Sequence, residues 1–288
     1  MRQLGLFIAS LGLVGGASAA DPHAGHDMST MPGMAVEAIQ PDLAGEGTAP
    51  PPPLDHYADR VFPPAEMEIA RRQMMREEGG QNFYQVMFNV AEYQLREEGD
   101  GYRWDGEAWF GQDLDRLTLK SEGEGSGDGL EAAELQALYS HAIGPYFNLQ
   151  AGVRQDFEPS PSRTYATVGF EGLAPYWFEI EAALFLSDHG DWLSRFEGYY
   201  DQRITQRVIL QPRFELNLAA QDVPENEIGS GLSNAELGLR LRYEVTRELA
   251  PYVGVSWDRK YGDTANYARA AGEDPSIWSL VAGLRFWF

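Results

Sequence analysis

The chain has 288 residues and carries 44 aspartates and glutamates against 22 lysines and arginines, which gives a net charge of −22. A chain this acidic is a poor partner for nucleic acid, because phosphate groups bind basic patches. It contains no cysteine, so disulfides and thiolate metal ligands are excluded.

The first residues have the composition of a secretory signal peptide. Met1-Arg2-Gln3 supplies a basic start, Leu4–Val14 is a short apolar stretch, and Ala17-Ser18-Ala19 is a small-residue cleavage motif. A buried N-terminal helix is the weaker alternative. We expect residues 1–19 to be a signal peptide that is cleaved after Ala19 or Ala20.

Residues 20–54 lack hydrophobic periodicity and are rich in glycine, proline, methionine and alanine. Such a composition cannot build a core, so we expect a disordered arm that ends in the stiff proline-rich linker Pro50–Pro53. Within twelve residues of this arm lie five potential metal ligands: His23, His26, Met28, Met31 and Met34.

The ligand types in the arm indicate copper. Thioether sulfur selects Cu(I) and imidazole also suits Cu(II), so mixed His and Met ligation predicts copper, with Cu(I) preferred and Cu(II) possible. A methionine stripe on a helix and a plain disordered tail are the alternatives. Gly25, Pro32 and Gly33 argue against the helix, and the flanking residues offer no core for the methionines to fill.

Residues 55–80 are predicted to form a periplasmic helical segment or a plug for the domain that follows. Pro63-Pro64-Ala65 opens a run of good helix formers from Glu66 to Glu78, and Gly79-Gly80 ends it. Proline at the start and glycine after the end are the usual limits of a helix.

Over residues 81–288 the hydrophobic pattern has a period of two, which predicts β-strands. Twelve segments can be counted: 82–97, 102–111, 114–122, 131–142, 145–157, 163–172, 176–187, 191–201, 204–218, 233–246, 250–261 and 277–288. The apolar face of the first segment is Tyr84, Val86, Phe88 and Val90. In a later segment Leu237 and Leu239 alternate with Glu236 and Arg240. This alternation predicts an all-β fold, a transmembrane antiparallel up-and-down β-barrel of about 12 strands, with one face in lipid and ion pairs in its lumen.

The connections agree with this fold. Tight junctions alternate with longer ones such as Gly123–Leu130, Ala219–Leu232 and Gly262–Ser276, as periplasmic turns and external loops alternate in outer-membrane barrels. The last strand, Ile277–Phe288, ends in an aromatic residue, which resembles the recognition signal of such barrels. Pro212 is awkward, because it would remove a ladder hydrogen bond. An even number of strands leaves both ends on one side, so we expect a bacterial outer-membrane protein with a periplasmic arm.

Additional candidate copper ligands precede and begin the barrel: His56, Met67, Met74, Met75 and Met87. Met67 and Met74 are seven residues apart and share a helix face, although packing is the alternative role of such a stripe. Met87 has the same strand parity as Gln85 and Asn89, so we expect its thioether to face the lumen.

Several segments resemble the copper resistance protein B family of bacterial outer-membrane proteins. They are the His and Met residues of the arm, Asp55–Asp59, Leu138–Ile143, Leu149–Arg154, Gly169–Tyr176 and Tyr199–Gln202. The resemblance implies a copper-binding outer-membrane barrel used in copper resistance, often alongside a periplasmic multicopper oxidase. Copper ions and outer-membrane lipid are the other expected partners.

The expected function is a contribution to copper resistance and homeostasis, by sequestering copper ions or exporting them from the periplasm. The alternative is a general or selective diffusion channel with an incidental metal-binding tail, although a pore has no need of the ligands in the arm. We expect no enzyme activity. Ser140 and His141 are adjacent in a strand, so their side chains point to opposite faces and cannot form a nucleophile and base pair.

Overall fold

The computed structural model describes residues 56–97, 99–127 and 129–288. Its helices are η2 (Tyr57–Arg60), α1 (Pro64–Glu77), η3 (Pro175–Trp177), η4 (Pro224–Asn226) and α2 (Gly262–Ala271). Its strands are β1 (Phe83–Arg96), β2 (Gly101–Gly111), β3 (Asp115–Ser126), β4 (Gly129–Ala142), β5 (Phe147–Glu158), β6 (Arg163–Ala174), β7 (Phe178–Ser187), β8 (Trp192–Tyr200), β9 (Gln202–Arg203), β10 (Val208–Ala219), β11 (Gly231–Tyr243), β12 (Leu249–Lys260) and β13 (Ser276–Trp287). Among the helices of these residues, none is long and apolar enough to span a membrane.

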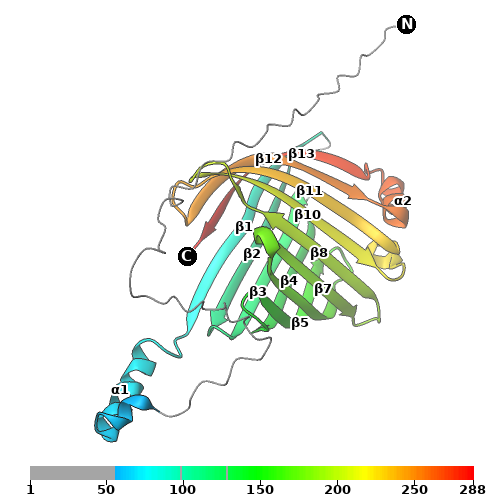
Figure 1. The fold of residues 1–288 in the computed structure, drawn as a ribbon. Coiled ribbons are helices and arrows are strands. Elements are labelled where there is room, and N and C mark those ends of the chain that lie inside the picture. The colour runs from blue at the N-terminus through cyan, green and yellow to red at the C-terminus, as the bar shows by residue number, and fades with distance from the viewer. Residues whose placement is uncertain (1–55, 98, 128) are drawn as a thin grey trace, which may run out of the picture. The chain divides into compact units, whose positions relative to one another are not determined.

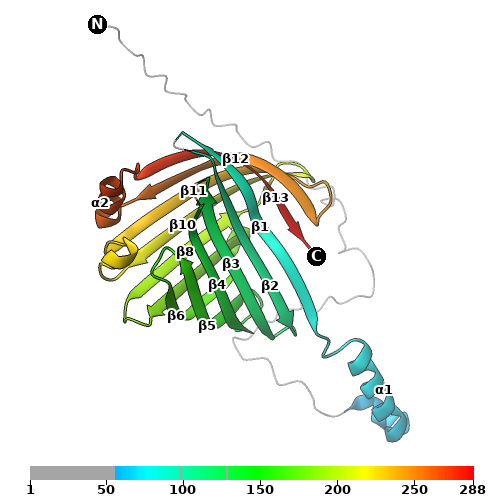
Figure 2. The ribbon, with the colours of Figure 1, turned by 180° about the vertical axis from the view of Figure 1, so that it is seen from behind.

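The strands form one antiparallel sheet that closes on itself. Neighbours in sequence are neighbours in the wall, and β1 pairs with β13 across the seam, for example at Tyr93 and Ala282. Both β8 and β9 pair with β10, so the thirteen strands of the described chain occupy twelve wall positions. Figures 1 and 2 show the wall from opposite sides. The predicted up-and-down barrel of about 12 strands is confirmed.

The two ends of the barrel differ. β1 begins and β13 ends at the same end, because these two strands are antiparallel neighbours. We call this the terminus end. The opposite end, which we call the loop end, carries the two longest connections, residues 220–230 and 261–275. The second connection contains α2, a helix that the sequence analysis did not predict.

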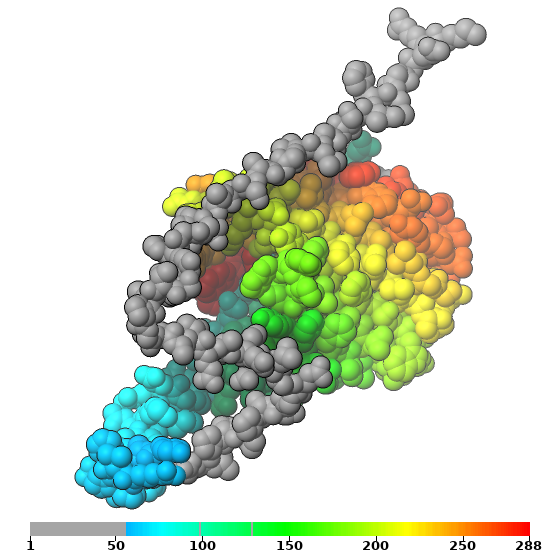
Figure 3. All heavy atoms as spheres, in the orientation of Figure 1, coloured from blue at the N-terminus to red at the C-terminus, as the bar shows by residue number. Residues whose placement is uncertain are grey.

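Burial along the strands is inverted relative to a soluble protein. In β11, Leu237, Leu239 and Leu241 are 50%, 42% and 44% exposed, whereas Glu236 and Arg240 are 3% and 2% exposed. Apolar side chains therefore cover the outside of the wall and charged side chains fill the lumen, as in a barrel that lies in lipid. Figure 3 shows the packed outer surface over the strands of the second half of the chain.

The predicted loop Gly123–Leu130 is wrong. β3 continues to Ser126 and β4 begins at Gly129, and these two residues pair with each other, so both strands extend into the predicted loop. Gly123 lies within β3, and a Cβ atom there would be 2.2 Å from the ring of Trp104 on β2. Glycine at this position makes room for an aromatic ring in the sheet, so it does not mark a loop.

A bulge in β1 changes which side chains face the lumen. The pairing with β2 shifts register between Phe88 and Val90, and Val90 is only 3% exposed. The sequence alternation placed Val90 on the lipid-facing side with Tyr84, which is wrong, because the extra residue of a bulge reverses the alternation. Beyond the bulge, Tyr93 is exposed and Glu92 is buried.

Pro212 is accommodated by a break in the eighth wall position. β8 pairs with β10 as far as Tyr199 and Arg213, and β9 resumes the same register at Gln202 and Leu210. The interruption lies opposite Pro212, whose nitrogen has no hydrogen to donate to a ladder. One proline thus explains why a single wall position is divided into two strands.

The predicted helix before the barrel is present as α1. Pro64 occupies its first turn, as expected, and it ends at Glu77, one residue before the expected limit. None of its residues is buried. A role as a periplasmic segment or as a plug stays a prediction.

Candidate functional site

The predicted ligands of the arm lie outside the described residues. They are His23, His26, Met28, Met31 and Met34. The proposed signal peptide, residues 1–19, and the rest of the arm, residues 20–54, also lie outside them. Their assignments therefore stay predictions.

Four further candidate ligands precede the barrel. His56 is exposed just before η2, and its carbonyl accepts a hydrogen bond from the Asp59 N–H at 2.9 Å. On α1, Met67 is partly buried, while Met74 and Met75 are 55% and 56% exposed. An ion could therefore reach the sulfur atoms of Met74 and Met75 from solvent, and a ligand role for these four residues stays a prediction.

Met87 lies on β1 close to the terminus end. Its sulfur is 3.6 Å from Nη2 of Arg285, and Nη1 of Arg285 is 3.8 Å from Asp201. These contacts agree with the expected lumen-facing orientation of Met87. A guanidinium beside the thioether repels a cation, so copper could bind Met87 only after Arg285 turns away. In the described ranges, no group of three or more His, Asp or Glu side chains is arranged to hold a metal ion.

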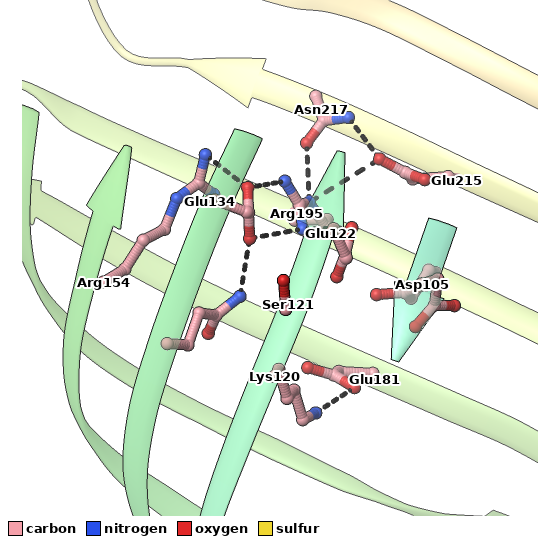
Figure 4. Close-up of polar contacts among 12 residues, drawn as sticks. Asp105, Lys120, Ser121, Glu122, Glu134, Arg154, Glu181, Arg195, Glu215 and Asn217 are labelled. Atoms are coloured by element: carbon pink, nitrogen blue, oxygen red, sulfur yellow. Dashed lines mark hydrogen bonds and ion pairs between the residues drawn. The ribbon is translucent and has the colours of Figure 1, made fainter. Parts of the chain in front are cut away.

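Ion pairs around Arg195 cross the centre of the lumen (Figure 4). Nη1 of Arg195, on β8, donates to Glu122 Oε2 at 3.0 Å, and Nη2 donates to Glu134 Oε2 at 2.8 Å. Glu134 also pairs with Arg154 at 2.7 Å. Glu122 is on β3 and Glu134 is on β4, several wall positions away from β8, so the Arg195 side chain spans the interior.

Aromatic rings support two of these guanidinium groups inside the barrel. Phe185 on β7 is 2% exposed and packs with Tyr165 and Ala183. The Arg154 guanidinium lies 4.5 Å from the Phe185 ring centroid and that of Arg195 lies 5.9 Å from it. Cation–π contacts of this kind are strongest where water is excluded, so Phe185 helps to fix both arginines in the lumen.

A second set of pairs crosses the lumen between β2 and the strands β10 and β11. Arg103 on β2 donates to Glu215 on β10 at 2.8 Å and also pairs with Glu236 on β11. Arg213 on β10 reaches back to Asp105 on β2 at 3.0 Å. β2 and β10 are far apart around the wall, so these side chains bridge the lumen from both sides.

Two more buried cations, Lys120 and Arg240, extend the network. Nζ of Lys120 is 3.0 Å from Glu171 and 2.5 Å from Glu181. Arg240 binds Glu92 through two hydrogen bonds of 3.0 Å each. The prediction of a lumen with ion pairs is confirmed. The arrangement is chemically suited to closing the interior, because each bridging side chain is held at its charged end.

Residues 220–230 and α2 together form what we call the cap at the loop end. Asn226 donates to the Pro161 carbonyl at 3.2 Å and accepts a hydrogen bond from Arg163 Nε at 3.2 Å. The Gly229 N–H donates to Thr264 Oγ1 of α2 at 2.9 Å. Because Arg163 begins β6 while Asn226 lies between β10 and β11, the cap links these two parts of the rim, and α2 contacts β11 and β12.

One charged group helps to hold the cap in its conformation. The Ser230 N–H donates to Asp222 Oδ1 at 2.7 Å. This hydrogen bond lowers the pKa of Asp222 below its ordinary value, because it favours the ionised form. Asp222 is therefore charged at neutral pH, and its hydrogen bond holds the two ends of residues 220–230 together.

Comparisons with known proteins identify the family of this chain. A family model described as "Copper resistance protein B precursor (CopB)" matches residues 82–288. "Copper resistance protein B" of Escherichia coli is 43% identical over 290 residues, which cover 99% of this chain and 96% of that protein. This chain belongs to the copper resistance protein B family. The "Copper resistance protein B homolog" of Pseudomonas syringae pv. tomato is 47% identical over 197 residues, which cover 68% of this chain and 67% of that protein.

Two solved porin structures were also matched to this member of the copper resistance protein B family. The NanC porin has a TM-score of 0.48 at 14% identity, covering 69% of this chain and 98% of its own. The KdgM porin has a TM-score of 0.43 at 9% identity, covering 70% of this chain and 98% of its own.

The sequence analysis of this family member missed the residues that bridge the lumen from β2 and β3. Arg103 and Asp105 alternate with Trp104, and this parity could have revealed them. Their partners could not be found in the same way, because Glu215 is more than a hundred residues away in sequence. Asn226 in the cap had no sequence signal that distinguishes it from an ordinary loop asparagine.

Ser140 and His141 point to opposite faces of β4, as expected. Ser140 is 3% exposed and faces the lumen. His141 faces outward, where its Nδ1 lies 2.7 Å from Asp115 Oδ1 on β3. In this family member the histidine thus has a carboxylate partner on the outer wall and does not contact the serine beside it.

Proposed function

We propose that this protein contributes to copper resistance by binding copper ions at the bacterial outer membrane. The observation that carries the proposal is membership of the copper resistance protein B family, over the whole barrel and nearly the whole chain. Copper is the cargo of the protein in this proposal and not a resident cofactor. The role is non-enzymatic, because binding and release of the ion require no bond to be made or broken in a substrate.

The arm supplies the first ligands in this proposal. His23, His26, Met28, Met31 and Met34 combine two imidazoles with three thioethers, a donor set that favours Cu(I) and tolerates Cu(II). The other candidates would receive copper after the arm: His56, Met67, Met74, Met75 and Met87. Met87 fits the last place in this order, since its sulfur lies in the barrel near the terminus end.

We propose sequestration on the periplasmic side in preference to free passage through the barrel. The ion pairs of Arg103, Arg195 and Arg213 cross the lumen, and the cap is held to the start of β6 at the loop end. Export would require the ion pairs to rearrange. A periplasmic multicopper oxidase is the partner that fits such a store, because it would oxidise bound Cu(I) to the less toxic Cu(II) and pass the electrons to dioxygen.

A diffusion channel is the second candidate function. The observation in its favour is that the strands form a complete ring around a central lumen. Vesicles containing the purified full chain distinguish the two. A copper store leaves the rate of entry of small sugars and of copper at the level of empty vesicles, whereas a channel raises both. A rate that rises for copper alone would support export through a rearranged lumen.

Replacing Met28, Met31 and Met34 together by leucine should weaken Cu(I) binding by at least about tenfold, equivalent to about 1.4 kcal/mol. Leucine keeps a similar volume and hydrophobicity but removes the sulfur donors. Cu(II) binding should fall less, because His23 and His26 remain. Competition with the Cu(I) chelator bathocuproine measures the change, and cells with the variant should lose copper tolerance but keep zinc tolerance.

The matched control carries Met67→Leu, Met74→Leu and Met75→Leu, which also removes three sulfur atoms but leaves the arm intact. We expect it to retain most of the Cu(I) affinity. If the control loses copper and the arm variant keeps it, the site lies on α1 and our assignment to the arm is wrong. If neither wild type nor variants retain copper, the copper-binding proposal itself fails. Heat-modifiable migration in gels would verify that the barrels fold.

A further inference from the structure

Arg259 differs from the other arginines in the strands. It lies on β12 near the loop end and is exposed, whereas its neighbour Asp258 faces the lumen, where Ser256 Oγ donates to it. Among the described strand residues, Arg259 is an outward-facing arginine with no carboxylate within ion-pair distance. By contrast, Arg240 on the neighbouring strand β11 is bound to Glu92 in the lumen. An external anion would stabilise an unpaired guanidinium on a lipid-facing wall through charge-assisted hydrogen bonds.

Aromatic rings hold this guanidinium in place. Its carbon lies 5.2 Å from the ring centroid of Tyr261 and 5.9 Å from that of Trp257. Trp257 is itself fixed, because its indole N–H donates to Ser276 Oγ at 3.0 Å and its ring stacks on Trp278 at 6.0 Å. Ring contacts leave the N–H groups of arginine available, and these groups match phosphate oxygens in a bidentate fashion.

The carboxylates of the connection that follows β12 are already engaged, and the first of them, Asp263, accepts a hydrogen bond from Asn266 Nδ2 at 2.9 Å. Glu273 pairs with Lys260 at 2.9 Å, and Asp274 accepts a hydrogen bond from the Ser276 N–H at 2.9 Å. None of these three carboxylates is within ion-pair distance of Arg259, so the guanidinium is left for a ligand from outside the protein.

An apolar groove lies below Arg259 on the same outer wall. It has a volume of about 550 Å³ and is lined by side chains that include Tyr93, Leu241, Val253, Leu280 and Ala282, a volume within the ~300–1,000 Å³ of typical ligand pockets. The small side chain of Ala282 creates the hollow, because its neighbours across the ladders, Tyr93 and Val253, are larger. No polar side chain lines it other than the Tyr93 hydroxyl, among the described residues.

The groove, the tryptophan pair and Arg259 follow one another along β12. Val253, Val255, Trp257 and Arg259 alternate with lumen residues and so share the outer face. At about 3.4 Å per residue, Arg259 lies roughly 14 Å from Val255, toward the loop end. An apolar region, then an aromatic belt, then a cation is the order in which a membrane presents acyl chains, the interface and phosphate groups.

We propose that this wall binds a phosphorylated, multiply acylated glycolipid of the outer leaflet, with its phosphate on Arg259 and an acyl chain in the groove beside Ala282. The loop end carries the long connections, which lie outside the cell in outer-membrane barrels, so the lipid belongs to the outer leaflet. This inference does not depend on the copper proposal, because it uses none of the candidate copper ligands.

Native mass spectrometry of the delipidated full chain tests the proposal. The protein in mild detergent is titrated with bis-phosphorylated lipid A, with its dephosphorylated form and with phosphatidylglycerol. Arg259→Gln should weaken binding of the phosphorylated lipid A about tenfold, and Ala282→Leu, which fills the groove, should weaken binding of both forms of lipid A. Arg269→Gln on α2 is the control for charge near the same rim, and Ala151→Leu on the outer face of β5 is the control for added volume. Both controls should bind like wild type.

Wild-type affinity for lipid A in both Arg259→Gln and Ala282→Leu would overturn the proposal. Equal binding of phosphorylated and dephosphorylated lipid A would remove the role of Arg259. Tighter binding of phosphatidylglycerol than of lipid A would overturn the assignment to the outer leaflet. Heat-modifiable migration of each variant verifies folding, and substitutions on the outside of the wall leave the lumen pairs intact.

Discussion

Replacing Arg103, Arg195 and Arg213 together by serine should convert a barrel that passes almost no ions into a cation-selective channel. These three side chains reach across the lumen to carboxylates on distant strands. Serine is too short to bridge, so water can fill the space. Four carboxylates then line the path without any counter-charge, and rings of carboxylates select cations. They are Asp105, Glu122, Glu197 and Glu215, whereas Glu134 keeps Arg154 and Glu236 keeps Arg240.

Single-channel recording in planar bilayers measures this change. Wild type should show a conductance near the baseline, and the variant should show a stable conductance whose reversal potential in a salt gradient indicates cation preference. The control replaces Arg203, Arg207 and Arg247 by serine, which removes the same charge from residues near the terminus end. It should behave like wild type. Equal conductance of the lumen variant and the control would contradict the view that ion pairs close the lumen.

Arg240→Met should lower the free energy of unfolding by about 3–5 kcal/mol, as expected when one partner of a buried ion pair is removed. The Glu92 side chain is fully buried and the Arg240 side chain is 2% exposed. After the substitution Glu92 keeps only neutral donors, the Tyr252 hydroxyl at 3.1 Å and the Gln94 amide at 3.0 Å. These donors do not compensate the buried charge. Urea unfolding of the protein in lipid vesicles measures the loss.

Two further variants isolate the buried charge as the cause. Adding Glu92→Gln to Arg240→Met should restore most of the lost stability, because no charge remains to be buried. Arg203→Met removes an arginine whose side chain is 55% exposed and pairs with Glu244 at 3.1 Å, so it should cost no more than about 1 kcal/mol. A loss for Arg203→Met as large as for Arg240→Met would contradict this interpretation.

The wall of the barrel could be predicted from the sequence because its signal is local. Each strand alternates apolar and charged residues, as at Leu237 and Glu236, and this pattern sets both the strand and its two faces. A bulge makes this assignment of the two strand faces fail. It reverses the alternation after Phe88, so Val90 is buried in the lumen although it has the parity of lipid-facing residues. Gly123 led to a different error. A glycine that makes room for the ring of Trp104 cannot be distinguished in the sequence from a glycine in a turn.

The contents of the lumen could be predicted only as a class of interaction. Parity places Arg195 inside, but which carboxylates it meets depends on the stagger of strands that close the barrel. The partner Glu122 is 73 residues away in sequence, and no local pattern reports that distance. The cap depends in the same way on closure, since Asn226 meets Pro161 only when β6 and β10 are brought to one mouth. The copper ligands are the opposite case, because their evidence is entirely local composition.

The inverted burial of β11 has a consequence for how the chain enters a bilayer. As a helix, this segment would expose Glu236, Arg240 and Arg242 to hydrocarbon, at roughly 2.5–3.5 kcal/mol for each charge near the bilayer centre. As an isolated strand it would also leave its backbone N–H and C=O groups unpaired in lipid. Arg242 pairs with Asp201 beyond the neighbouring strand β10, but Arg240 and Glu236 meet Glu92 and Arg103 only once the wall has closed. Insertion and folding of this barrel must therefore be one event, in which no strand enters the membrane before its neighbours.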